Sequence, residues 1–589
     1  MSAIAERLPA VLGRGTRFGA SHFIFAAAII CVVWLIVVPM VLLFLNSLRV
    51  GPPSFFGGEL TFRNYIAAFT HEHFFSALSN TVIFSVVASF GSLVTAIAFA
   101  WLIERSDMPF RNAAWVAMLL PLAMPGVIFA LSWMLLLLPE IGLLNVFLRW
   151  LCGLFGISIE SGPFDIQSLG GMIFLGWLRG VSTLFLMLVG VFRMMDPRLE
   201  EAGRLSGANP RRVLWRITLP LLGPAILAAG IYSFVNLLDS FEGPLVLGLA
   251  AGIFVLSTLI YFTARYQAPF DYGLSAAYAV FFMAVMAILA MFYIRMIRRA
   301  ERFAVVTGKG FRPVKYQLGK WRYSALGFFG FYFVLTILAP FLVLVWASLL
   351  PFYELPSFEV LQYVSLDNYV EVITNPRFTQ DLINTIIVAL GAGTLTLLVA
   401  FMISWVAVRT KYRARFVLDG LTFVSYAIPG VVVALALVFV YLQAPFKYLG
   451  IYGTVWIIVA GLMTQYLAFA TRTTNAGLLQ IHKELEEAAR VCGAGQWRTM
   501  WRITGRLLIG ALVAGWIWVV AHSMRSFAIP LVLAGKENEV LSVWLWIYWQ
   551  DGFISQASAL AVILILLTAI VGLLARKLLT NRQVGGPQG

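Results

Sequence analysis

Two polar segments interrupt an otherwise hydrophobic chain and contain residue types suited to binding a partner. They read LEEAGRLSGANPRRVLWRITLP (199–220) and LEEAARVCGAGQWRTMWRITGR (485–506), and 12 of their 22 positions are identical. Each begins with two glutamates, which are favoured near a helix N-terminus. Each then has a glycine, Gly207 or Gly493, that can end the helix at positive φ. A single helix-turn-helix of this kind could be an ordinary amphipathic loop, but two equivalent copies favour a paired binding surface.

Four further charged residues lie in apolar segments, where a charged side chain costs free energy and commonly has a function. Asp239 and Arg525 are 286 residues apart, which is also the offset between the two polar segments. Glu242 follows Asp239 by three residues, and Arg179 lies in another apolar segment. Asp239 and Arg525 are predicted either to pair as a gate near the axis or to lie at the outer interface, solvated by water. Glu242 is expected to share that site or to face the outer mouth. For Arg179 the alternative is to snorkel outward.

The chain lacks the motifs of several enzyme classes. It contains no G-x-x-x-x-G-K-[ST] phosphate loop, no H-E-x-x-H, no G-x-S-x-G and no paired-cysteine metal motif. Cys31, Cys152 and Cys492 are scattered, and His71 and His73 lie in a predicted outer loop, where histidines are more often solvated than metal-bound. We therefore expect no catalytic residue, no resident metal and no cofactor in this chain.

The composition indicates a membrane protein with many spans. Of 589 residues, 61% are hydrophobic and 12% are charged, and the apolar runs reach the roughly 20 residues that a helix needs to cross a bilayer. The runs are continuous rather than alternating, which favours helices over a barrel. Twelve spans are predicted, near residues 22–48, 78–102, 113–138, 169–192, 220–241, 273–297, 324–350, 382–408, 417–442, 454–475, 507–533 and 555–576.

The basic residues predict the orientation. Only 7 of the 42 lysines and arginines fall in loops assigned to the outside, and loops rich in these residues stay in the cytoplasm. Both termini and both polar segments are therefore expected to be cytoplasmic. The same bias explains the net charge of +15 without invoking nucleic acid. The opening apolar run has no cleavable signal pattern and is predicted to be a retained helix.

The chain is an internal repeat. Pro125-Gly126 matches Pro429-Gly430 at an offset of 304, and from the polar segments onward the offset is 286. The difference places an insertion at 139–168, whose amphipathic start is predicted to lie along the outer membrane surface. A polar linker, 298–322, joins a first half, 1–297, to a second half, 323–589. Six spans in each half make the repeats parallel, so both polar segments share one face. The Pro-Gly pairs are expected to kink the third spans.

The duplicated segment resembles the EAA loop of ATP-binding-cassette (ABC) importer permeases, the family of binding-protein-dependent transport system inner membrane components. The family pattern is Glu-Ala-Ala, three residues, Gly, nine residues and Ile-x-Leu-Pro. The first copy departs from it at Gly203, and the second ends in Gly505-Arg506, so its junction with the next span is expected to differ. The resemblance implies the type I importer fold and a coupling helix that docks on a separate ATPase. The residues it implicates are Glu200, Glu201, Ala202, Gly207, Glu486, Glu487, Ala488 and Gly493, with Arg204 and Arg490 as further candidates.

The fused arrangement of two halves resembles the ferric-iron subgroup of these permeases. That likeness implies the transmembrane subunit of a bacterial inner-membrane ABC importer, served by two ATPase subunits and an extracytoplasmic binding protein. Its substrate would be ferric iron or a related small anionic or chelated solute. Permeases for phosphonates, sugar phosphates, thiamine or polyamines are alternatives. A twelve-span secondary transporter would also have two parallel halves, but it would not explain the duplicated loops.

Overall fold

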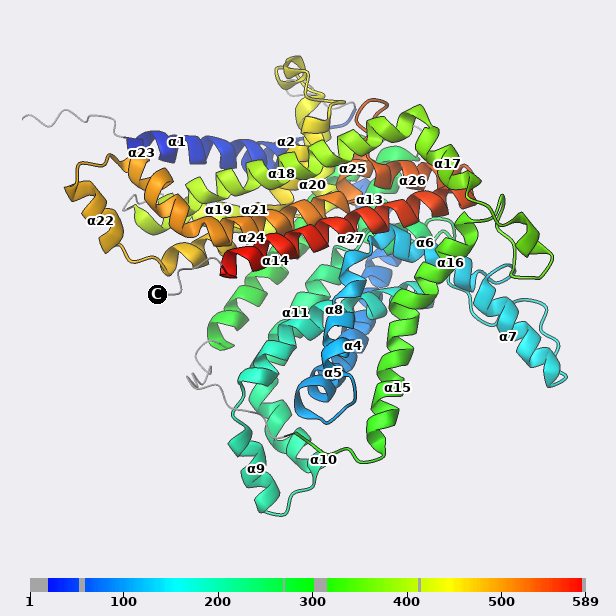
Figure 1. The fold of residues 1–589 in the computed structure, drawn as a ribbon. Coiled ribbons are helices and arrows are strands. Elements are labelled where there is room, and N and C mark those ends of the chain that lie inside the picture. The colour runs from blue at the N-terminus through cyan, green and yellow to red at the C-terminus, as the bar shows by residue number, and fades with distance from the viewer. Residues whose placement is uncertain (1–19, 52–58, 268–270, 301–314, 411–414, 585–589) are drawn as a thin grey trace, which may run out of the picture.

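The computed structural model describes residues 20–51, 59–267, 271–300, 315–410 and 415–584, and over these residues it is helical, without a strand. Ten helices there are long and apolar enough to cross a membrane, and two bent helix pairs bring the number to twelve. All twelve lie where the sequence predicts spans (Figure 1). The expected all-α polytopic fold is confirmed.

Each half contributes six spans in chain order. Those of the first half are α1–η1–α2 (Ala20–Val32, Val33–Val37, Val38–Ser47), α4 (Phe74–Arg105), α5–η2–α6 (Arg111–Ala117, Leu120–Ala123, Gly126–Leu137), α8 (Leu169–Met194), η3–α11 (Leu214–Thr218, Leu219–Leu238) and α14 (Tyr272–Ala300). Those of the second half are α15–η5–α16 (Trp321–Phe333, Val334–Leu338, Ala339–Ser348), α18 (Pro376–Arg409), α19–η7–α20 (Arg415–Val424, Ser425–Ala427, Gly430–Tyr441), α21 (Val455–Leu479), η9–α24 (Met500–Thr504, Gly505–Met524) and α27 (Ile554–Val584). Short helices connect the spans, including α12 (Glu242–Gly248), α13 (Leu256–Arg265), α25 (Ala528–Leu533) and α26 (Leu541–Gln550).

The third span of each half is broken rather than gently kinked. The two helical pieces meet at 97° in the first half and at 111° in the second. Pro125 and Pro429 lie at the breaks with the same extended backbone, φ −56° and ψ 144°. Proline has no N–H for the helical ladder and disfavours a helical residue before it. The predicted bend is therefore confirmed at Pro-Gly, and it is sharp enough to start a new helix at Gly126 and at Gly430.

Each broken pair still crosses from one side to the other. The guanidinium of Arg105, at the end of α4, donates to the carbonyls of Phe192 and Met195 at the end of α8, at 2.7 and 2.9 Å. The ends of α4 and α8 therefore lie on the same side, and α8 is a single straight span. Since α8 begins on the opposite side, the chain must cross once between the end of α4 and the start of α8. Only α5–η2–α6 can make this crossing. Six crossings in each half make the two repeats parallel, as predicted.

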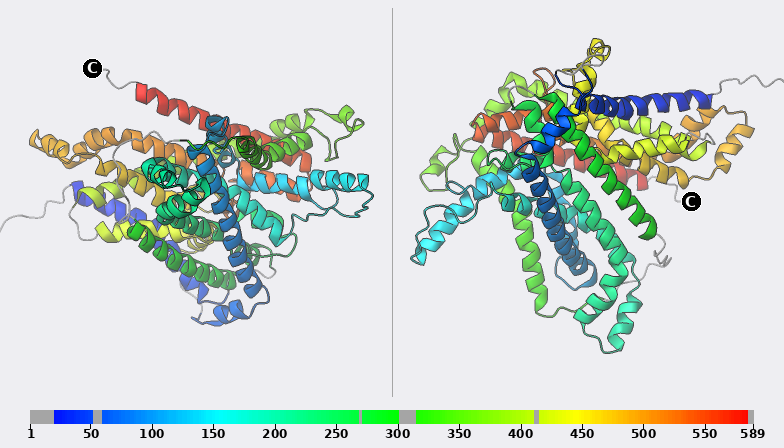
Figure 2. Two further views of the ribbon diagram at one scale, coloured as in Figure 1. Left: turned by 90° about the horizontal axis from the view of Figure 1, so that it is seen from below. Right: turned by 180° about the vertical axis from the view of Figure 1, so that it is seen from behind.

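The spans form two arms that diverge from a common junction. Figure 1 shows α9 (Pro197–Leu205) and α10 (Pro210–Val213) at the end of one arm, and α22 (Glu484–Val491) and α23 (Gln496–Thr499) at the end of the other. Figure 2 shows the same divergence from behind. The polar loops are thus at the far ends of the arms, while α6, α12 and α25 lie near the junction. Helix α1 begins, and helix α27 ends, on the side of α22 and α23.

The first spans are exchanged between the halves. In α1–η1–α2, the carbonyl of Leu35 accepts a hydrogen bond from Thr464 of α21, and Trp34 donates to the hydroxyl of Tyr441 in α20, both at 3.0 Å. In α15, the Tyr332 hydroxyl donates to the carbonyl of Leu178 in α8 at 3.1 Å, and Phe328 stacks on Phe99 of α4. Each half is therefore completed by a helix of the other, and neither packs as an independent unit.

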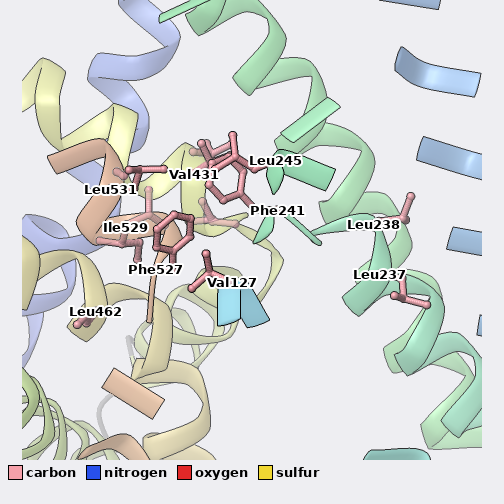
Figure 3. Packing of buried hydrophobic residues seen from close by; sticks show 14 of the residues in the cluster. Val127, Leu237, Leu238, Phe241, Leu245, Val431, Leu462, Phe527, Ile529 and Leu531 are labelled. Atoms are coloured by element: carbon pink, nitrogen blue, oxygen red, sulfur yellow. The ribbon is translucent and has the colours of Figure 1, made fainter. Parts of the chain in front are cut away.

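The junction of the arms is closed by apolar side chains, most of which are repeat equivalents of one another. Figure 3 shows Val127, Phe241, Leu245, Val431, Phe527, Ile529 and Leu531 gathered there; we call this set the apex. The rings of Phe241 and Phe527, which are 286 residues apart, face each other at 6.4 Å between centroids. All seven are buried. The apex therefore seals the junction at the end opposite to the polar loops.

The insertion at 139–168 forms a separate helix, α7 (Leu143–Leu154), which projects sideways from α6 in Figure 1. The buried Asn145 ties it to the end of α6 by donating to the carbonyls of Leu137 and Leu138 at 2.9 and 3.2 Å. Its Phe147, Trp150 and Leu154 are exposed. An exposed aromatic face at helical spacing on a helix that runs sideways from the spans agrees with the predicted interfacial position.

Candidate polar loops and pathway residues

The two polar loops fold alike. The first polar loop comprises α9, α10 and η3 (197–218), and the second comprises α22, α23 and η9 (484–504). Gly207 and Gly493 both have a φ of +81°. After each glycine the chain closes a Schellman turn, with Ala208 N–H donating to the Gly203 carbonyl at 3.1 Å and Ala494 N–H to the Ala489 carbonyl at 3.0 Å. The predicted helix, glycine turn and second helix are therefore observed in both copies.

The junction with the next span is also the same in both loops, contrary to expectation. Leu214–Thr218 and Met500–Thr504 are both π-helical turns that continue into the fifth span. Pro220 explains the irregular turn in the first copy, because it removes one ladder donor. The second copy keeps the turn with Gly505-Arg506 in place of Leu-Pro. The turn is thus set by how the loop packs rather than by proline alone.

The paired glutamates at the start of each loop have different environments. Glu200 and Glu486 are buried, whereas Glu201 is partly exposed and Glu487 is exposed. Ala202 and Ala488 beside them are exposed as well. The second glutamate of each pair and the following alanine thus offer the surface that a partner could bind. The first glutamate faces its own chain.

Each buried glutamate is held by an arginine at the end of the second span. In the second half, Arg409 Nε donates to Glu486 Oε1 at 2.8 Å, and the Thr504 hydroxyl donates to the same oxygen at 3.0 Å. In the first half, Thr218 donates to Glu200 Oε1 at 2.7 Å and Arg105 Nη1 lies 3.7 Å from Glu200 Oε2. A buried carboxylate is tolerated when it is paired and hydrogen-bonded in this way. Neither arginine was selected from the sequence, although the offset of 304 relates them.

The charged residues of the predicted gate meet beside the apex, but in a different pairing. Arg179 Nη2 lies 3.6 Å from Glu242 Oε2, so Arg179 does more than snorkel outward. Arg525 Nη2 is 2.5 Å from His522 Nε2. The predicted pair of Asp239 and Arg525 is absent among the ion pairs of the described residues. The carboxylate that pairs with an arginine here is Glu242 instead, because it is the first residue of α12 and lies toward α8.

Carboxylates also lie at the N-termini created by the broken spans. The Asp239 carboxylate faces the backbone N–H of Gly430, and the Glu242 carboxylate faces that of Gly126. A helix N-terminus favours negative charge. A Cβ at Gly126 would overlap the Glu242 carboxylate and the Arg179 guanidinium, so a larger residue there must displace this ion pair. Since arginine can only donate, His522 Nε2 must accept from Arg525, and its Nδ1–H donates to the Trp518 carbonyl at 2.8 Å.

The outer histidines are not part of a metal cluster. His71 and His73 face each other at 5.5 Å between ring centroids, and His73 lies 3.3 Å from Glu72. Throughout the described residues, no three His, Cys, Asp or Glu side chains are placed to hold a metal ion. Desolvation and the neighbouring His73 lower the pKa of His71 below its usual value.

Comparison with known proteins identifies the class of chain. Residues 397–583 match the family described as "Binding-protein-dependent transport system inner membrane component". This segment of the second half is similar to the permease domain of that family. The second polar loop lies inside the matched region, and the first half repeats its spans and its loop. The chain is therefore a multi-pass membrane subunit of the importer-permease type.

Two relatives match nearly the whole length of this permease. A putative ferric transport system permease protein of Haemophilus influenzae is 25% identical over 88% of this chain and 79% of its own. A ferric transport system permease protein of Actinobacillus pleuropneumoniae is 26% identical over 91% of this chain and 75% of its own. Among solved structures, a bacterial alginate ABC transporter has 18% identity and a TM-score of 0.35, covering 43% of this chain and 91% of its own.

Proposed function

We propose that this chain is the transmembrane subunit of an ABC importer, which forms the pathway and couples ATPase closure to solute entry. The observation that carries the proposal is the pair of polar loops, built alike and placed at the ends of two diverging arms (Figure 1). Each loop presents an exposed or partly exposed glutamate, Glu201 or Glu487, beside a rigid glycine turn. Two equivalent docking elements suit a symmetric pair of cytoplasmic ATPase subunits, and a secondary transporter would have no use for them.

Solute movement follows from the way the arms are joined. They meet at the apex and separate at the polar loops, so this arrangement corresponds to a pathway open toward the ATPase side. Drawing the loops together would close that side and open the apex. Exposing Phe241 and Phe527 to water would cost about 1.5–3 kcal/mol each. The binding of ATPases and of a loaded binding protein must supply that difference between the two states.

Ferric iron is the substrate that we propose. Relatives named for ferric transport match this chain over 88% and 91% of its length, across both fused halves. A sn-glycerol-3-phosphate permease of Salmonella choleraesuis is 28% identical but matches only 43% of the chain. The fused architecture is therefore shared with the ferric relatives and not with the sugar-phosphate one. ATP and magnesium would bind to the partner ATPases, and an external binding protein would deliver the iron.

Purification and uptake test the proposal together. The full chain, purified in detergent from its own bacterium, should carry an ATPase that is lost when Glu201 and Glu487 are both changed to alanine. Changing Glu140 and Glu160, in the insertion around α7, to alanine should leave the ATPase bound. Cells lacking the chain should lose uptake of radioactive ferric iron. Unchanged iron uptake with loss of sugar-phosphate uptake would assign the alternative substrate, and ion-driven uptake by the chain alone would refute the importer.

A further inference from the structure

One arginine in each half joins four elements that the transport cycle must move together. Arg105 ends α4 and Arg409 ends α18, the second spans of the two halves. Both side chains are almost completely buried, at 1% and 3% exposure. Arg409 Nη2 donates to the carbonyls of Leu478 and Ile481 at the end of α21, at 3.0 and 2.8 Å. Arg105 does the same to Phe192 and Met195 at the end of α8.

The remaining face of each guanidinium is turned toward the polar loop. Arg409 reaches Glu486, and Glu486 in turn holds Thr504, the last residue of the π-helical turn before α24. In the first half Thr218 donates to Glu200 in the same way, but Arg105 Nη1 lies 3.7 Å from Glu200 Oε2, an ion pair without a hydrogen bond. One side chain thus links the second span, the end of the fourth span, the polar loop and the start of the fifth span. We call each such set a loop tether.

Arginine suits this position better than any other cation. Its planar fork offers five donors in fixed directions, which allows it to bind two helix-end carbonyls and a carboxylate at once. The carbonyls at the end of a helix have no partner of their own within the helix. A lysine could reach one acceptor group but would leave the others without a donor.

We propose that Arg105 and Arg409 are the positioning residues that transmit movement of the polar loops to the spans. The inference rests on the proposed function, since it assumes that an ATPase pulls on the loops. Without the tether, a loop would still bind its ATPase through the exposed Glu201 or Glu487 surface. The loop would then shift against α4 and α8, or α18 and α21, rather than carry them. ATP hydrolysis would continue while solute movement failed.

The decisive quantity is the amount of solute imported per ATP hydrolysed. It would be measured in vesicles containing the whole complex, with radioactive ferric iron presented on its binding protein. Arg105→Met with Arg409→Met should lower this ratio by roughly tenfold or more, in the range of ordinary coupling free energies, while the ATPase stays bound. Arg409→Lys on an Arg105→Met background should recover part of the loss, because charge returns without the fork.

The matched control is Arg193→Met. Arg193 also lies at the end of α8 and pairs with Glu104 of α4 at 2.6 Å, but it is 61% exposed and does not contact a polar loop. It should leave the ratio unchanged.

If the tether variants lose import and ATPase activity in equal proportion, the arginines only stabilise the fold and the inference is wrong. Should the arginine variants fail to assemble, Thr218→Val with Thr504→Val removes the last link of each tether and must lower the same ratio. Failure of any ATPase to bind the wild-type chain would instead refute the proposed function.

Discussion

The two polar loops are near-copies in sequence and in fold, yet their surroundings differ. Both have the same glycine turn, π-helical junction and buried glutamate. The first is also held by the linker between the halves: the guanidinium of Arg204 lies 3.9 Å from the centroid of the Tyr316 ring. The equivalent Arg490 in the second loop is exposed. The two polar loops are therefore equivalent in sequence but differ in their contacts, because the linker that fuses the halves binds the first loop.

The linker contact is part of a small bridge. Tyr316 N–H donates to the Arg105 carbonyl at 2.7 Å, and Asp107 N–H donates to the Tyr316 carbonyl at 3.0 Å. The Asp107 carboxylate accepts from Leu318 N–H at 2.8 Å. The residue whose side chain tethers the first loop thus also fixes the linker through its backbone. The second loop has a different neighbour, because its α23 packs against α1.

The same inequality appears beside the apex. Arg179 and Glu242 of the first half correspond to Gln465 and Ala528 of the second at the offset of 286. The ion pair therefore has no counterpart at the equivalent positions. Gly126 is crowded by charged groups, whereas Gly430 has the amide of Gln465 nearby. Matched substitutions at equivalent positions can accordingly separate what the fold requires from what the pathway requires.

The largest difference is expected between Gly126→Ala and Gly430→Ala. A Cβ at residue 126 must displace the Glu242 carboxylate, and overpacking of this kind costs about 1–3 kcal/mol. At residue 430 the nearest atom would be Gln465 Nε2 at 3.2 Å, which a small side-chain shift relieves. Iron uptake into whole cells should fall by roughly tenfold or more for the first variant, at about 1.4 kcal/mol per tenfold, and little for the second. Equal losses would show that the two breaks are equivalent.

Charge exchange at the apex should give the next largest effect. Glu242→Arg should lower uptake, and adding Arg179→Glu should restore part of it. Breaking the pair should cost less than the about 3–5 kcal/mol of a fully buried pair, since Arg179 is 39% exposed. Asp239→Arg combined with Arg525→Asp should not recover, because those two side chains do not pair. Recovery in that second combination would contradict the pairing described here.

The linker contact should have a smaller effect, confined to one loop. Tyr316→Ala removes a cation–π contact of about 0.5–2 kcal/mol, so amide hydrogen exchange should accelerate in residues 199–208. Exchange in residues 485–494 should not change. Tyr316→Phe keeps the ring and serves as the control. Faster exchange in both loops would mean that the linker acts on the whole fold.

Making the second junction resemble the first should have the smallest effect. Arg506→Pro gives a Gly-Pro ending, with proline at the position of Pro220 in the first copy, and proline is well accepted at the start of a helix. Because the π-helical turn is already present, we expect stability to change by no more than about 0.4–1 kcal/mol. Thermal unfolding in detergent would measure it, with Arg502→Pro, inside the turn, as the destabilising control. A large loss for Arg506→Pro would mean that the two junctions differ in a way the backbone does not reveal.

Much of the architecture could be predicted from the sequence because its signals are local. Apolar runs of sufficient length determined the twelve spans, and turn chemistry determined the glycine breaks in both polar loops. The internal offsets of 304 and 286 determined that the halves are repeats. Pro-Gly predicted where the third spans bend. These features depend on residues that are neighbours in the chain, and the bilayer leaves a helix little alternative.

Only the tertiary structure decided which distant residues meet. It separated Glu200 from Glu201, and Glu486 from Glu487, although each pair is adjacent in sequence, because one side of the helix packs against Arg105 or Arg409. It exchanged the first spans between the halves and placed Glu242, rather than Asp239, beside Arg179. Burial and pairing depend on how helices far apart in the chain are packed, and a buried charge is stable only with its partner in place. The sequence by itself determined the repeated elements, while packing between them determined which of two similar residues faces a partner and which holds the fold.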